Sequence, residues 1–371
     1  MWPLIPDVAA LTSYINTSLL TNDKYAHLLG ELIKAGKNKE NIEDVLSFLR
    51  SLLAVSKGGE VRGLTETNLV SLQHLICAVI VNKLNVKFPD QDTPYHNLGN
   101  WIKSIDRKIA IEIFTTNYDI LTELAFEDLE IPYFDGFVGA RRSFFDLRAV
   151  EDNLIPSHWS RIWKIHGSIN WYQEKVAGQL KVYRSSEVRG ELEEGEVSHL
   201  IYPSHLKYEE SRKMPYLALI DQLTRFIRKK SSFLILCGYS FSDGHINDAI
   251  INALKANATA MVLGLMYENF YVCGPDGATK ERYPEAYRLA KGQHNLNVWT
   301  FDKAIIGTNI GSWRVSKDTG DIEEEILEFV LKQKDKDGNF TGKNLLKLGD
   351  FAQFTSFLKR MIGMRGDKND Q

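Results

Sequence analysis

The first hundred residues carry apolar positions at helical spacing. Ile42, Val45, Leu46 and Leu49 recur three or four positions apart, which is the pattern of an amphipathic helix. Residues 69–84 are apolar on nearly every face, so we expect a helix that is buried or packed against a partner subunit. Residues 7–100 are therefore predicted to be mainly helical. Gly and Asn positions predict loops within this region at residues 34–39, 57–59 and 90–100.

The pattern changes near residue 105. Short apolar runs there alternate with segments of helical spacing, which favours a parallel sheet with helices on its faces. The predicted strands are residues 109–115, 162–166, 200–203, 233–237, 260–265 and 297–301. The predicted helices between them are residues 120–129, 215–229, 243–256 and 284–290.

Two further segments depart from this alternation. Residues 173–195 are polar and lead into the acidic run 191–196, so we predict a surface hairpin or flap inserted in the sheet domain. Residues 322–333 and 345–361 have helical spacing and are separated by a stretch rich in Lys, Asp and Gly. They are predicted to be two closing helices.

Composition and charge argue against several classes of protein. The chain has 371 residues, of which 44% are hydrophobic and 25% are charged, as in ordinary globular proteins. The formal net charge of −3 gives no sign of nucleic-acid binding. The short basic run at residues 225–230 reads as a solvated helix end, or as a contact for an acidic partner.

The cysteines and the first residues bear on the cellular compartment. Cys77, Cys237 and Cys273 are widely spaced and form no CxxC pair, which argues against a structural zinc module and a disulfide framework. This usage fits a reducing, cytoplasmic location. The first fifteen residues carry two prolines and no basic leader, so they are not predicted to be a signal peptide. We expect no apolar run of membrane-spanning length.

Polar residues gather where the first predicted strand ends. Thr115, Thr116, Asn117 and Asp119 follow an apolar run, and open α/β sheets bind their ligands at the carboxyl ends of strands. The Asn117 carboxamide holds a hydroxyl or a water in place but cannot act as a base. Asp119 has two readings, as a cap on the helix that starts near residue 120 and as a ligand contact.

A second polar cluster ends the next predicted strand. His166 is placed there for general acid–base work near neutral pH, although a buried histidine bonded to backbone fits the same position. Gly167 permits close approach of a ligand to the backbone, and Ser168 can donate to a phosphate.

The third cluster joins a strand to a helix. Gly238 and Ser240 lie just before a predicted helix start, where backbone N–H groups can bind a diphosphate. The same residue types also serve ordinary helix capping.

Together the three clusters resemble the motifs of the sirtuin family, in the same order. Residues 115–119 resemble Thr-Gln-Asn-Ile-Asp, residues 166–168 resemble the His-Gly motif, and residues 238–240 resemble the Gly-Thr/Ser-Ser loop. The resemblance covers about residues 105–310 and is nearest to bacterial sirtuin-like proteins of anti-phage defence that hydrolyse NAD. It implies an α/β fold with a Rossmann-like parallel sheet. The implied domains are a helical region at 1–104, an NAD-binding domain at 105–312 and a helical tail at 313–371.

Two departures from the family pattern change the expectation. Sirtuin deacylases carry a four-cysteine zinc module, which three cysteines cannot build, so hydrolysis of NAD is favoured over protein deacylation. The family also opens with a strand and a Gly-Ala-Gly phosphate loop, and no such loop precedes Thr115. We expect it on an omitted or mobile N-terminal piece, because a sheet without this strand would expose apolar neighbours. If the loop is absent, NAD binding would be impaired.

The resemblance implies a cleavage of NAD to nicotinamide and ADP-ribose, without a metal. Asn117 would position the ribose and the water, and His166 would act as a base. Thr115, Thr116, Asp119, Gly167, Ser168, Gly238 and Ser240 would contact the nucleotide. It also implies a HerA-type ATPase as partner. The apolar helix expected at residues 69–84 and the two tail helices offer association surfaces, so we expect a homo-oligomer. Two other readings stay open, an NAD- or ADP-ribose-binding regulatory subunit and an NAD-dependent deacylase.

Overall fold

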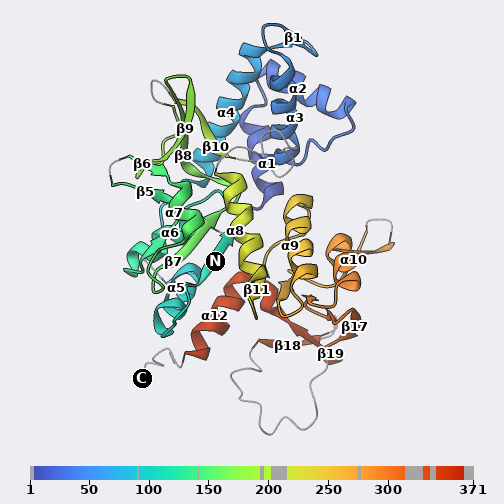
Figure 1. The fold of residues 1–371 in the computed structure, drawn as a ribbon. Helices are drawn as coiled ribbons and strands as arrows, with labels where there is room; N and C mark the ends of the chain where they lie inside the picture. Colours follow the sequence, from blue (N-terminus) through green and yellow to red (C-terminus); the bar gives the residue numbers. More distant parts are fainter. Residues whose placement is uncertain are drawn as a thin grey trace, which may run out of the picture. The chain divides into compact units, whose positions relative to one another are not determined.

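The chain is a mixed α/β protein that divides into two compact units (Figure 1). The structure is a computed structural model that describes residues 4–89, 92–140, 142–192, 196–201, 215–274, 277–313, 329–334 and 340–362. Unit 1 comprises Met1–Phe88, Arg107–Asp128 and Pro132–Leu219, and unit 2 comprises Pro89–Asp106, Leu129–Ile131 and Ile220–Gln371. Each unit is built from several separate segments of the chain, whereas the domains predicted at 1–104, 105–312 and 313–371 are continuous. The predicted domain boundaries stay a prediction.

Four helices at the start of unit 1 pack around one hydrophobic core, as the apolar spacing predicted (Figure 1, blue). They are α1 (Val8–Ser18), α2 (Asp23–Lys34), α3 (Ile42–Val55) and α4 (Glu66–Leu84). Each helix has an N-cap residue whose side chain accepts a hydrogen bond from a backbone N–H of the first turn. This bond satisfies one of the N–H groups that the start of a helix leaves unpaired. A short hairpin of β1 (Glu60–Val61) and β2 (Leu64–Thr65) precedes α4.

Helix α4 is the apolar helix expected at residues 69–84. Leu69, Ile76 and Ile80 are fully buried in the core of unit 1. By length and composition alone, α4 is also long and apolar enough to cross a membrane, with a mean hydropathy of 1.2. We had expected no such segment. The buried face of α4 shows why a core helix passes the same test, since a helix that is apolar all round can serve either role.

A three-stranded parallel sheet in unit 1 holds the first two predicted strand ends. Its order is β3-β7-β4, with β3 at Glu112–Thr115, β7 at Ser160–Lys164 and β4 at Tyr133–Phe134. Phe114 lies opposite Trp163 in the register, so β3 and β7 end side by side. Helix α6 (Leu121–Asp128) follows β3. Strand β3 begins later than predicted, and Ile109 is 75% exposed outside it.

The polar insertion forms part of an antiparallel sheet in the same unit. The five-stranded order is β10-β8-β9-β6-β5, with β8 and β9 as the predicted hairpin. The strands are β5 (Phe137–Val138), β6 (Ser143–Phe145), β8 (Gly167–Val176), β9 (Gln179–Arg184) and β10 (Glu196–Ile201), and α7 (Leu147–Asp152) follows β6. The prediction that residues 200–203 join the parallel sheet was wrong for 200–201, because β10 pairs antiparallel with β8. Residues 202–203 lie outside the described residues.

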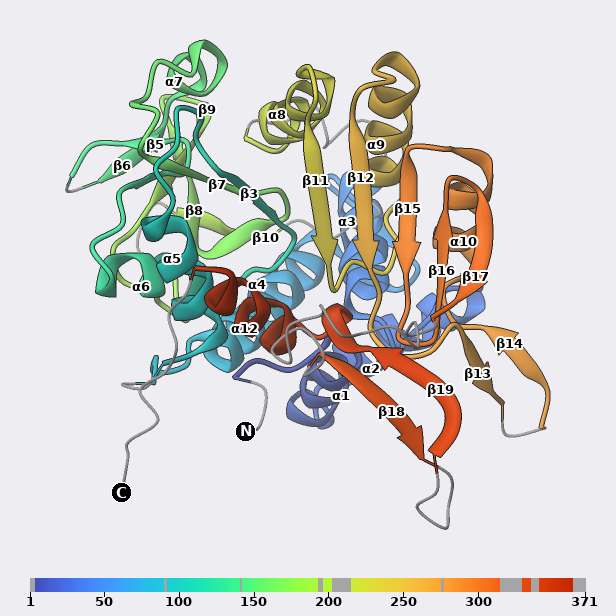
Figure 2. The same ribbon diagram turned by 90° about the horizontal axis from the view of Figure 1, so that it is seen from below.

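Unit 2 contains the remaining predicted strands in a second sheet (Figure 2). Its order is β11-β12-β15-β16-β17, of which the first three strands are parallel. The strands are β11 (Phe233–Cys237), β12 (Met261–Leu265), β15 (Leu296–Trp299), β16 (Lys303–Ile306) and β17 (Asn309–Ser312). Helices α9 (Gly244–Ala256) and α10 (Pro284–Gly292) connect the parallel strands as predicted, α8 (Tyr216–Arg228) precedes them, and β13 (Tyr271–Cys273) pairs with β14 (Thr279–Glu281).

The single parallel sheet of the sequence prediction is therefore two sheets. Strands β3 and β11 are each at the edge of their own sheet. Within the part of the chain that the structure describes, no strand pairs with the outer edge of either. A continuous sheet needs an unbroken ladder of neighbouring strands, and the apolar runs in the sequence do not report which strands are neighbours. The parallel three-stranded sheet is consistent with a sirtuin-like fold.

Two local predictions in unit 2 were wrong. Residues 94–100 were predicted to be a loop, but α5 spans Pro94–Ser104, because Pro is tolerated in the first turn and Thr93 forms a capping box with His96. The first tail helix was predicted at 322–333, where residues 330–333 instead belong to β18 (Val330–Lys334). This strand pairs antiparallel with β19 (Phe340–Leu346), which overrides the local helical spacing. Residues 322–328 lie outside the described part.

The second tail helix is present as α12 (Phe351–Met361), after the short 3₁₀ helix Lys347–Gly349. Asp350 caps it by accepting the Ala352 N–H at 2.8 Å. Helix α12 packs against α5 within unit 2, where the rings of Tyr95 and Phe351 lie 5.3 Å apart. An ion pair between Lys359 and Asp92, at 3.2 Å, joins the same two segments.

Candidate active site

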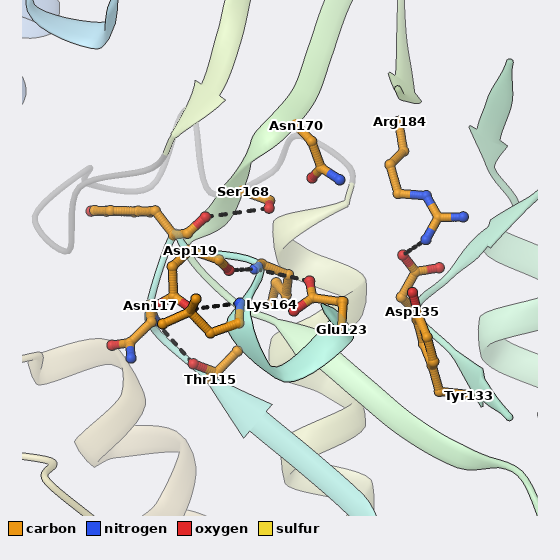
Figure 3. A network of polar contacts seen from close by, with 12 residues as sticks. Thr115, Asn117, Asp119, Glu123, Tyr133, Asp135, Lys164, Ser168, Asn170 and Arg184 are labelled. Atoms are coloured by element: carbon orange, nitrogen blue, oxygen red, sulfur yellow. Dashed lines mark hydrogen bonds and ion pairs between the residues drawn. The ribbon is translucent and has the colours of Figure 1, made fainter. Parts of the chain in front are cut away.

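The turn after β3 presents the predicted orienting amide. The Asn117 N–H donates to Thr115 Oγ1 at 3.0 Å, which closes a tight turn directly at the strand end. The Asn117 side chain is exposed, and Figure 3 shows its carboxamide pointing away from the buried residues beside it. Thr116 is half-buried within the same turn. Asn117 is therefore held by its backbone while its side chain is free to meet a ligand.

Asp119 serves the helix that follows. Its Oδ1 accepts the Leu121 N–H at 2.9 Å, so the capping reading of this residue is correct. The residue is buried, and its other oxygen, Oδ2, has no hydrogen-bond partner among the described residues. A buried carboxylate oxygen without a partner is costly, so the capping role leaves half of this group unexplained.

The second predicted cluster lies at the corner between β7 and β8. His166 is 3% exposed, and its ring lies 6.4 Å from that of Tyr118. Gly167 has a φ of +85°, a left-handed conformation that favours glycine. Ser168 Oγ donates to the Tyr118 carbonyl at 3.3 Å, and the Ile169 N–H donates to the same oxygen at 2.9 Å.

These contacts bring seven of the nine predicted site residues into one local structure in unit 1. They come from the ends of two neighbouring parallel strands, where we expected a ligand site. Thr115, Thr116, Asn117 and Asp119 lie on the turn after β3, and His166, Gly167 and Ser168 lie on the corner after β7. The nucleotide-contact roles of these residues stay predictions.

The sequence analysis missed a buried ion pair beside this turn. Lys164 is the last residue of β7, is 1% exposed, and places Nζ 3.0 Å from Oε1 of Glu123 on α6. Lys164 Nζ also donates to the Asp119 carbonyl. Burial raises the pKa of the Glu123 carboxyl, and the Lys164 ammonium opposes that shift. The available signal was a lysine within the short run Ile162–Ile165, whose other residues are apolar.

A second ion pair in unit 1 joins a buried carboxylate to a half-buried arginine. Arg184 on β9 donates to Asp135 Oδ2 at 2.6 Å (Figure 3). Burial raises the pKa of the Asp135 carboxyl, and Arg184 opposes that shift. Asp135 Oδ1 also accepts the Phe137 N–H at 3.1 Å. The pair joins the segment before β5 to β9, and among the described residues it makes no hydrogen bond or ion pair with the turn after β3.

The third predicted cluster lies in unit 2, in the loop between β11 and α9. Gly238 has a φ of +73° and is exposed, and the exposed Ser240 shares a hydrogen bond of 2.9 Å with Ser242. Asp243 accepts the N–H groups of His245 and Ile246 at 2.8 and 3.1 Å. The start of α9 is thus capped by its own carboxylate, and the two serine hydroxyls lie on the exposed side of the loop.

Among the residues that the structure describes, no group of three or more His, Cys, Asp or Glu side chains is arranged to hold a metal ion. Cys77 is buried, Cys237 is half-buried and Cys273 is exposed, and all three are free thiols.

The comparison with known proteins concerns the stretch of chain that contains these clusters. A search of curated proteins gave no match. Residues 111–290 match the family model of the SIR2-like domain, and this range includes every predicted site residue. SIR2-like domains are often NAD-processing enzymes, so the match suggests an NAD-related activity at the level of the family. Residues 111–290 therefore carry a SIR2-like domain, which supports a sirtuin-like family for this protein.

Proposed function

We propose that the protein hydrolyses NAD to nicotinamide and ADP-ribose. The observation that carries the proposal is the local structure formed by the Asn117 turn and the His166–Ser168 corner. Hydrogen bonds from Ser168 and Ile169 to the Tyr118 carbonyl hold the two strand ends together. Both lie in the range that matches the SIR2-like domain.

The proposed chemistry breaks the bond between the ribose C1′ and the nicotinamide nitrogen. The bonding electron pair leaves with nicotinamide, which departs neutral from a cationic ring. The ribose passes through a transition state of oxocarbenium character, as in glycoside hydrolysis, and the oxygen of a water molecule bonds to C1′. The proton of that water must be removed. Asn117 orients the ribose and the water, and His166 accepts the proton.

The experiment is to incubate the protein with NAD and to follow free nicotinamide and ADP-ribose. Asn117→Ala and His166→Ala should each lower the rate by ~10²–10⁴-fold, the range for a positioning or acid–base group. His158→Ala is the matched control, since His158 is exposed outside the site. Turnover that survives both substitutions would show that these residues are not the catalytic groups.

A regulatory role is the second candidate, and the burial of His166 favours it. A ring that is 3% exposed suits a binding fold that holds ADP-ribose without turning over NAD. Binding of NAD without release of nicotinamide would support this candidate over hydrolysis. Release of nicotinamide only when an acyl-lysine peptide is added would identify a deacylase instead.

We further propose that the hydrolase depletes NAD in the cytoplasm as part of anti-phage defence, as a homo-oligomer held by a HerA-type ATPase. The support is the likeness of residues 115–119, 166–168 and 238–240 to the motifs of defence-associated sirtuin-like proteins. Light scattering of the purified protein tests self-association, and co-purification with such an ATPase tests the partner. A monomer at micromolar concentration would contradict intrinsic assembly.

A further inference from the structure

The Lys164–Glu123 pair lies between the two segments that carry the proposed chemistry. Lys164 ends β7, two residues before His166 in the corner that follows, and its Nζ donates to the carbonyl of Asp119, two residues after Asn117. Glu123 completes the contact from α6, at 3.0 Å (Figure 3). One side chain therefore connects the His166 segment, the Asn117 turn and the helix that follows that turn.

The turn is fixed to β7 and β8 mainly through its carbonyl oxygens. The Thr115 carbonyl accepts the Ile165 N–H at 2.9 Å, and the Tyr118 carbonyl accepts the Ile169 N–H and Ser168 Oγ. The Asp119 carbonyl accepts Lys164 Nζ. Lys164 is the charged donor in this set, and hydrogen bonds from charged groups are the stronger ones.

The pair is not explained by stability. Taking a lysine and a glutamate out of water costs free energy that their attraction only partly repays, and apolar residues of similar size often serve a core as well. Lys164 is nonetheless 1% exposed, and Glu123 Oε2 has no hydrogen-bond partner among the described residues. What the pair does geometrically is hold the Asp119 carbonyl in place, because Glu123 fixes the Lys164 ammonium that donates to it.

We propose that Lys164 and Glu123 are positioning residues, which hold the turn after β3 so that the Asn117 carboxamide keeps its direction relative to His166. Asp119 takes part, because its Oδ1 caps α6 and its carbonyl receives Lys164. The inference rests on the proposed NAD hydrolysis for its catalytic consequence. A displacement of about 1 Å in a positioning group is enough to lower a rate ~10²-fold.

The test replaces the pair by apolar side chains of similar size. The double variant Glu123→Leu with Lys164→Met leaves no unpaired charge, so it is expected to fold. We expect its kcat for nicotinamide release to fall ~10–100-fold while KM stays within about threefold. The matched control, Asp135→Leu with Arg184→Met, removes another ion pair of unit 1 that has a buried carboxylate, and it should keep kcat within about twofold.

A double variant that keeps the wild-type kcat would overturn the proposal. If that variant does not fold, Glu123→Gln decides instead, since it keeps an oxygen for Lys164 and removes only the charge. Its kcat should fall ~3–10-fold with KM little changed, and an unchanged kcat would overturn the proposal.

A second readout does not depend on turnover. Hydrogen exchange at the Leu121, Ile165 and Ile169 amides, which donate to the turn, should be at least ~10-fold faster in the Glu123→Leu, Lys164→Met variant than in the wild type. The control variant should show wild-type exchange there. If the wild type releases no nicotinamide, the proposed hydrolysis fails, and equal exchange in the variant and the wild type would separately overturn the positioning role.

Discussion

At the scale of single residues, the notable feature of unit 1 is that several ionisable side chains are buried. Lys164 and Glu123 are buried as a pair, and the buried Asp135 is paired with the half-buried Arg184. Removing one partner of such a pair leaves a buried charge uncompensated, which typically costs about 3–5 kcal/mol, whereas removing both costs far less. Glu123→Gln is the milder single change because it keeps an oxygen for Lys164, but a single apolar substitution at these positions reports mainly on folding. This is why the double variants are the informative ones.

The half-buried thiol of Cys237, immediately before Gly238, gives a prediction that depends on pH. Burial and the nearby Asp350 carboxylate raise its pKa to about 12. The thiolate is the reactive form, and at pH 8 a thiol of that pKa is ~10⁻⁴ ionised. We expect iodoacetamide to label the exposed Cys273 at pH 8 and to label Cys237 at least ~100-fold more slowly.

Mass spectrometry of peptides after timed labelling measures the two rates. Labelling in urea is the control, since unfolding should bring the Cys237 rate close to that of Cys273. Fast labelling of Cys237 in the folded protein would show that its thiol is not protected as described.

The polar residues at the strand ends could be predicted from the sequence, but the side chains that contact them could not. Asn117, His166 and Ser168 stand out because polar side chains follow apolar runs. Glu123 and Lys164 are 41 positions apart by their numbering, and no local pattern reports that a helix and a strand bring them together. The capping role of Asp119 could be proposed in advance because it involves only the next two residues.

At the scale of elements, the corner between β7 and β8 sets the position of His166 and Ser168. It depends on Gly167, whose φ of +85° is costly for any residue with a Cβ atom. Gly167→Ala should destabilise the protein by about 1–2 kcal/mol and lower nicotinamide release more than ~10-fold, because the corner must rearrange.

Chemical denaturation and the nicotinamide assay measure the two effects. Gly30→Ala in the interior of α2 is the matched control, with open space around the added carbon, and should raise stability by about 0.5–1 kcal/mol. Wild-type activity in Gly167→Ala would mean that the corner does not govern the site.

Helices and strands with a clear hydrophobic periodicity were predicted well. Those that depend on helix capping or on pairing with a distant strand were not. The helices α4 and α9 and the strands β11 and β12 lie close to their predicted bounds, and α3 contains the apolar positions that predicted it. Helix α5 was missed because Pro94 and Gly99 signal a loop, although Pro94 occupies the one turn where a helix tolerates it. Strand β18 was taken for helix because its pairing with β19 is not a local property.

At the scale of the whole molecule, most of the predicted strands are present, but they form more than one sheet. Strands β3 and β7 pair in unit 1, and β11, β12 and β15 pair in unit 2. The alternation of strands and helices predicted parallel pairing in both, and that prediction is confirmed. Which strand neighbours which is set by long-range contacts that a hydrophobic pattern does not encode.

A ligand that binds only the folded protein raises the temperature at which it unfolds. ADP-ribose at 100 times its dissociation constant should stabilise the protein by about 2.7 kcal/mol, which a thermal shift assay detects. Ribose 5-phosphate is the control compound and should have a smaller effect, because it lacks the diphosphate and the adenosine. His166→Ala should keep the shift while losing turnover, and absence of a shift with millimolar ADP-ribose would contradict nucleotide binding.

The packing of α12 against α5 has a consequence for how the protein is made. A ribosome releases the chain from its first residue, so α5 is available long before α12, whose Lys359 pairs with Asp92 across 267 positions. Contacts of such separation form late and slow the completion of a fold. Unit 2 therefore stays incomplete during translation until the residues of α12 have emerged, and a chain whose synthesis stops before them leaves the α5 face that meets α12 uncovered.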